Sequence, residues 1–222
     1  MTTIIEGANK IYALTPVELV IDDIDTASWA SSKIVSNPDN AWVVCRYVEA
    51  DSANSNKQYW ALDSLIESMY TIKNSALNVN HNQKNLIGFW SDVEMLYPND
   101  ASSEANPWIE SLGLIWKTRF PEYYKRIQSD HANGQLFSSM ECSAESITCG
   151  NESCSQTFAY RGPYDESYCI HIRERSAYRK FNKPVFHGGA LILSGTKPGW
   201  SGAWSTELSG LNDYEMDFAF EQ

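Results

Sequence analysis

Residues 134–142, GQLFSSMEC, carry the pattern from which both the fold and a reactive site are predicted. The Asn133-Gly134 pair before this stretch is a strong turn signal, and the residues after it alternate as in a β-strand. Alternation places Phe137, Ser139 and Glu141 on one face and Leu136, Ser138, Met140 and Cys142 on the other. Because the second set is more apolar, we expect it to face the core and Ser139 to face a cleft.

Outward from this strand, further elements are predicted on both sides. Strand patterns occur at residues 41–49, 76–80, 86–96 and 185–194, and apolar residues recur at helical spacing over 59–72 and 108–127. The second helix begins after Pro107 and is expected to break at Pro121. This order predicts an α+β fold, with an antiparallel or mixed, barrel-like β-sheet core, flanking helices and a Cys-rich insertion.

The chain length of 222 residues favours one domain. Residues 1–40 have an irregular composition and are interpreted as an N-terminal extension. Residues 144–183 are the Cys-rich insertion, and residues 205–222 form an acidic C-terminal tail.

Composition excludes some partners and indicates a compartment. The formal net charge is −11 and no Lys/Arg cluster stands out, so we expect no nucleic-acid partner. No apolar stretch is long enough to span a bilayer, so no membrane contact is expected. The first ten residues lack the features of a signal peptide, and the five cysteines are an odd number. These observations favour a reducing compartment, the cytoplasm.

A serine hydroxyl becomes a nucleophile when an adjacent base takes its proton, and histidine is the commonest such base. Among the four histidines, His81 has the best context, because it ends the strand at 76–80 and precedes a polar turn at 82–85. The alternative is that His81 is a surface loop histidine and Ser139 an unrelated core serine, because sequence spacing alone does not distinguish the two. The residues by themselves leave both interpretations open.

Three short stretches carry a family resemblance: residues 78–88, NVNHNQKNLIG; Gly134 with the strand after it; and residues 186–200, FHGGALILSGTKPGW. They resemble the motifs of the tailed-phage prohead (capsid maturation) serine proteases. The first resembles the family's His motif, in which a strand delivers the histidine and an Ile-Gly opens the next strand. The second resembles the nucleophile motif, and the third resembles the closing strand and its Pro-containing exit. The resemblance covers residues 41–143 and 184–204.

The resemblance implies a single protease-like domain, similar in fold to the herpesvirus assembly proteases, which use a serine and two histidines. It implies Ser139 as nucleophile and His81 as base. The third member is left open between His187, slightly preferred, and Glu141, which shares the face of Ser139. No cofactor is needed for catalysis.

The resemblance also implies the biological setting of a serine endopeptidase. Its substrates would be phage scaffold and major capsid proteins, inside the immature head in the host bacterial cytoplasm. Self-association is expected. Self-cleavage is expected too, and the tail at 212–222 is a candidate site.

The insertion contains a pattern typical of a structural zinc site. Cys149 and Cys154 flank a turn containing Gly150, and Cys169 and His171 are expected to share one strand face. These four residues supply the ligand types and number that structural zinc prefers. The alternative is a set of reduced, half-buried cysteines without a metal.

Two rival functions remain. One is a non-catalytic virion or assembly protein with the protease fold, a pseudoenzyme. The other is a cysteine hydrolase using Cys142, which the alternation disfavours because it turns that thiol inward.

Overall fold

A computed structural model describes residues 11–19, 29–35, 37–98, 105–163, 165–194 and 205–209. The strands are β1 (Ile11–Leu19), β2 (Ala41–Glu49), β3 (Gln58–Tyr59), β4 (Ala76–Val79), β5 (Asn82–Leu96), β6 (Trp108–Ile115), β7 (Phe137–Cys149), β8 (Thr157–Ala159), β9 (Arg179–Ile192) and β10 (Ser205–Ser209). The helices are α1 (Leu62–Ser68), α2 (Pro121–Ala132) and α3 (Ile170–Arg173), with 3₁₀ turns η1 (Ser31–Lys33) and η2 (Met69–Ile72). The α+β class predicted from the sequence is confirmed.

The strands form one mixed sheet that closes on itself. Neighbours follow the order β3-β9-β4-β5-β6-β2-β10-β1-β7-β8, and additional pairing of β7 with β9 completes a circuit. Most pairs are antiparallel, whereas β4 pairs with β9 in parallel. A closed sheet has no free edges around its circumference and encloses one core. The barrel-like core is therefore present, and it is filled mainly by the large side chains Trp60, Trp90, Tyr47 and Phe181.

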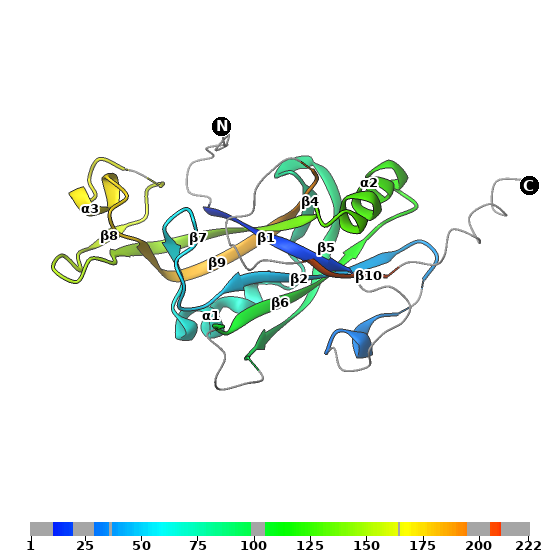
Figure 1. The fold of residues 1–222 in the computed structure, drawn as a ribbon, viewed down its shortest axis with the longest axis horizontal. Helices are drawn as coiled ribbons and strands as arrows, with labels where there is room; N and C mark the ends of the chain where they lie inside the picture. Colours follow the sequence, from blue (N-terminus) through cyan, green and yellow to red (C-terminus); the bar gives the residue numbers. More distant parts are fainter. Residues whose placement is uncertain are drawn as a thin grey trace, which may run out of the picture.

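Strands β7 and β9 form the most extensively paired ladder of the sheet and organise the molecule. They run side by side from Phe137↔Ile192 to Cys149↔Arg179. In Figure 1 a small lobe with β8 and α3 lies at one end of this pair, and α2 lies at the other. The expected insertion at 144–183 therefore begins and ends as extensions of β7 and β9, and only the residues between them leave the sheet.

The region 108–115 corrects one prediction. We expected a helix there, but Trp108–Ile115 forms β6, paired with β2 and β5. Residues 109–115 are all buried, because the barrel core covers one face of the strand and a second apolar cluster with Trp42 covers the other. A short apolar run buried on both faces has no strand alternation, so its periodicity does not distinguish strand from helix. The helix begins only at Pro121, a favourable first helical residue.

Candidate active site

A tight turn between β4 and β5 presents His81. Val79 pairs with Asn82, so Asn80 and His81 form a two-residue hairpin loop, and their φ angles are +53° and +57°. Positive φ at both loop residues is the pattern of a type I′ turn. Asn and His are among the non-glycine residues that adopt this left-handed conformation most readily, so the two residues suit the turn. The polar turn expected at 82–85 is instead the start of β5.

Two hydrogen bonds join this turn to β9 and the residue that follows it. The backbone N–H of Asn80 donates to the Leu191 carbonyl, and the Asn80 side-chain oxygen accepts a hydrogen bond from the Leu193 N–H. Because β9 also pairs with the strand that bears Ser139, one strand fixes both the turn and the serine. This explains how a residue on a hairpin tip can be held at a defined distance from a residue in the sheet.

Ser139 lies within β7, between Ala190 of β9 and Leu14 of β1. Its Oγ is 2.8 Å from His81 Nε2, and His81 Nδ1 is 2.9 Å from Glu141 Oε1. An ionised carboxylate can only accept, so Nδ1 carries the proton and Nε2 is free to accept from the Ser139 hydroxyl. The three groups form a chain of hydrogen bonds from hydroxyl to imidazole to carboxylate.

The exposure of Ser139 differs from the expectation. Both Ser138 and Ser139 have 0% exposure, whereas Ser139 was expected to face an open cleft. The hydroxyl of Ser139 lies at the Nε2 edge of the His81 ring, and the His81 side chain is itself only 14% exposed. The alternation itself is as expected, because Ser139 and Glu141 both contact His81 while Met140 and Cys142 belong to the core.

Glu141 is held by two neighbours that the sequence did not indicate. Asn78, which is 2% exposed, donates from Nδ2 to Glu141 Oε1 over 3.0 Å. Tyr47 reaches the backbone of the same residue: its hydroxyl donates to the Gly188 carbonyl and accepts from the Glu141 N–H. Burial raises the pKa of Tyr47 well above its ordinary value, so the phenol keeps its proton.

The Tyr47 hydroxyl sits at an irregularity in the β7–β9 ladder. Glu141 pairs with Gly188, but the next residue, Cys142, pairs with Phe186, so His187 is an extra residue in β9. A bulge interrupts the regular backbone hydrogen bonds. The hydroxyl of Tyr47 supplies partners at this point, and thereby fixes the backbone on which the Glu141 side chain is mounted.

His187 is not brought to the site. It is exposed, and its Nε2 lies 2.6 Å from Ser143 Oγ. The bulge turns this residue outward, and the position next to His81 is taken by Glu141. The slight preference for His187 as the third member is therefore corrected.

Cys142 is unsuited to nucleophilic attack. The thiol is fully buried, and burial raises its pKa far above the ordinary value, so the reactive thiolate is not formed near neutral pH. This disfavours the cysteine hydrolase.

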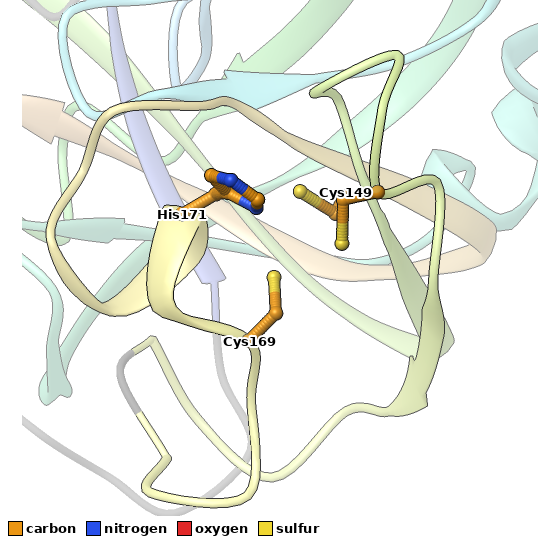
Figure 2. A group of neighbouring side chains, drawn as sticks. Cys149, Cys169 and His171 are labelled. Carbon is orange, nitrogen blue, oxygen red and sulfur yellow. The ribbon is translucent and has the colours of Figure 1, made fainter.

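A second group of chemically active residues lies in the lobe at the far end of β7 and β9. Cys149 ends β7, Cys154 follows a turn made by Asn151, and Cys169 and His171 come from the first turn of α3. Their ligand atoms all lie within 4.8 Å of one another (Figure 2), so the cluster could bind a metal. The expected shared strand face of Cys169 and His171 is wrong, because a helical turn brings them together instead.

Comparison with solved structures found a similarity in fold. No protein-family model matches the chain, and no curated protein matches it. The chain is similar to the structure of the bacteriophage T4 capsid assembly protease gp21, with a TM-score of 0.49 and 11% identity. The similarity covers 86% of this chain and 100% of that one.

No helix among the described residues is long and apolar enough to cross a membrane.

Proposed function

We propose that this protein is a serine endopeptidase with Ser139 as nucleophile, His81 as general base and Glu141 as the orienting carboxylate. The observation that supports it best is the continuous hydrogen-bond chain Ser139–His81–Glu141. A hydroxyl, an imidazole and a buried carboxylate in this order are the parts of a catalytic triad, which is recognised by geometry and not by chain order.

The reaction follows from the positions of the protons. Ser139 Oγ bonds to the scissile carbonyl carbon while its proton moves to His81 Nε2. Glu141 stabilises the imidazolium that forms. The C–N bond then breaks, and His81 gives the proton to the departing amine. A water molecule attacks the resulting ester, with His81 again taking and returning the proton, and Ser139 is regenerated.

For substrates we propose segments of phage scaffold and major capsid proteins, cleaved inside the immature head. Support comes from the three sequence motifs that resemble prohead proteases, two of which contain the proposed base and nucleophile. The whole chain acts as one domain in this proposal, and the enzyme associates with itself. The proposed self-cleavage site at 212–222 lies outside the described residues.

The decisive experiment compares two neighbouring serines. The chain is co-expressed with its capsid and scaffold proteins as wild type, Ser139→Ala and Ser138→Ala, and the processed fragments are identified by mass spectrometry. Both serines are fully buried, so the two variants make matched changes. We expect Ser139→Ala to lower processing by at least about 10³-fold, while Ser138→Ala keeps it. Unchanged processing with Ser139→Ala would overturn the assignment.

One observation favours a second candidate, the non-catalytic assembly protein. Ser139 has no exposed surface, so a substrate can reach it only after the surface above it opens. A fluorophosphonate probe separates the two: a serine protease is labelled at Ser139, and a pseudoenzyme stays unlabelled both alone and with its capsid and scaffold partners.

The metal ion expected for the cluster in the lobe is zinc. Cys149 lies ten residues beyond Ser139 on β7, roughly 33 Å at the usual rise of a strand. We therefore propose no part for this ion in peptide cleavage.

A further inference from the structure

We propose that Cys149, Cys154, Cys169 and His171 bind one zinc ion at a closed structural site. The bound ion holds together the segment between β7 and β9. We call this segment, residues 150–163 and 165–178, the tip lobe. The proposal is independent of the peptidase function and starts from the geometry of the four side chains.

The four ligand atoms are spaced for a single small ion. They lie within 4.8 Å of one another, from three separate segments of chain (Figure 2). In a tetrahedral zinc site with Zn–S bonds of about 2.3 Å, neighbouring ligands are about 3.8 Å apart. A small inward movement of the side chains therefore completes the coordination.

The His171 ring gives a second observation, which is separate from the spacing of the ligand atoms. Its Nδ1 is buried and has no hydrogen-bond partner among the described residues. An unsatisfied buried polar atom is destabilising, so such atoms are rare. The ring is thus placed as a metal-ligating imidazole is, beside three thiols, and not as a hydrogen-bonding surface histidine.

Backbone hydrogen bonds hold the segments that carry the ligands. The Ile172 and Arg173 N–H groups donate to the Cys169 carbonyl, and the Cys154 N–H donates to the Asn151 carbonyl. Cys169 lies at the N-cap of the short helix α3 and His171 lies in its first turn. These bonds fix the backbone on which the ligand side chains are mounted.

The lobe has little regular structure of its own, which favours a cross-link. It contains one three-residue strand, paired with β7, and one four-residue helix. Its buried apolar side chains belong to the main core cluster and are Tyr160, Tyr168, Ile172 and Ala177. Segments of this size rarely fold on an apolar core alone and are commonly stabilised by disulfides or metals. Cys149, Cys154 and Cys169 are free thiols here, which leaves a metal as the cross-link.

The donor set selects the ion and its role. Three thiolates and one imidazole suit zinc and not the oxygen-preferring magnesium or calcium. Four protein ligands leave no open position for water or substrate, so the site is structural and not catalytic.

The first test measures metal and thiols on the full chain. Elemental analysis of protein purified without added metal is expected to find about one zinc per chain. Zinc release on titration with a mercurial should require modification of three thiols, since Cys45 and Cys142 are buried in the core. A chain that contains no zinc and takes up none when refolded with it overturns the proposal, and so does a disulfide within the lobe.

The second test exchanges one ligand. His171→Cys keeps four ligands and is expected to retain zinc, whereas His171→Phe is expected to lose it. Cys45→Ala, a change to a buried cysteine outside the cluster, is the control and should retain zinc. Limited proteolysis should cut the tip lobe at least about tenfold faster in His171→Phe than in untreated wild type. Wild type treated with a chelator should show the same increase.

These outcomes separate the two proposals. Fluorophosphonate labelling of Ser139 addresses the triad, whereas zinc content addresses the lobe. Equal zinc content in His171→Phe and wild type would exclude the ring as a ligand, whatever the result for Ser139.

Discussion

The side-chain amide of Asn78 donates a hydrogen bond to the same oxygen of Glu141 that receives the His81 Nδ1 contact. Both residues are buried, so this bond is not weakened by competing water. Asn78 is on β4, two residues before the hairpin turn, whereas Glu141 is on β7. The bond therefore ties the element that presents the base to the element that carries the nucleophile.

From this relationship we predict that Asn78 positions the carboxylate. Asn78→Ala should lower kcat/KM about 10–100-fold with little change in KM, because the carboxylate loses one of its two anchors but the triad atoms remain. Asn78→Asp should also move the acidic limb of the pH–rate profile to higher pH, since a second carboxylate favours the charged imidazolium.

A purely structural role for Asn78 would give a different result. Both variants would then lose thermal stability while the shape of the pH–rate profile stayed as in wild type. Asn182, whose side-chain amide donates to the Ser146 and Thr148 hydroxyls farther along the β7–β9 pair, offers a control as Asn182→Ala. That variant should leave the profile unchanged.

The choice between Glu141 and His187 gives the second prediction. Glu141→Gln should lower kcat by about 10³–10⁴-fold, because an amide does not stabilise the imidazolium and can leave the ring in the wrong tautomer. His187→Ala should change kcat by less than about threefold, since His187 is exposed and its ring contacts the half-buried Ser143 hydroxyl and not the triad. A large loss with His187→Ala and a small one with Glu141→Gln would reverse the assignment.

The third prediction concerns the hydroxyl at the β7–β9 bulge. Tyr47→Phe keeps the ring contacts with Trp90 and Phe186 but leaves the Gly188 carbonyl and the Glu141 N–H without their partner. We expect urea denaturation to show a loss of about 1–3 kcal/mol in the free energy of unfolding. Activity should fall as well, because the Glu141 backbone gains freedom.

A matched control for this change is Tyr70→Phe. Tyr70 is 66% exposed, so its hydroxyl is already hydrated and its removal should alter stability by less than about 0.5 kcal/mol. If Tyr47→Phe were equally neutral, the hydroxyl would have no part in holding the bulge.

The sequence predicted those features that depend on short-range patterns. Alternation in β7 placed Ser139 and Glu141 together, and the composition of 41–49 and 76–80 was enough to identify β2 and β4. The cluster of Cys149, Cys154, Cys169 and His171 was also predicted, because ligand types within a short insertion can be recognised without a fold.

Other features depend on contacts between distant segments and carried no local signal. Burial of β6 on both faces comes from the closure of the barrel and from the cluster around Trp42. The outward turn of His187 follows from a bulge that requires both β7 and β9. Tyr47 is 94 positions before Glu141, and nothing near it in the sequence indicates that its hydroxyl would meet that backbone.

The fourth prediction uses the charge network at Asp92. Burial alone would raise the pKa of this carboxyl, but hydrogen bonds from Lys33 and Lys73 outweigh it and lower the pKa to about 2. A carboxyl whose folded pKa lies below its unfolded value of about 3.9 stabilises the protein above that pH. Its contribution is lost as the pH falls from about 4 to about 2.

Asp92→Asn measures this contribution directly. A pKa lowered from about 3.9 to about 2 corresponds to between about 2 and 3 kcal/mol, and the partial exposure of both lysines reduces the expected effect to about 1 kcal/mol. Urea denaturation at pH 7 should therefore show the variant less stable than wild type by that amount. The difference should shrink as the pH is lowered toward 2, and it should also shrink in 1 M salt, where exposed lysine charges are screened. An equal loss at every pH would mean that the side chain acts through packing and not through its charge.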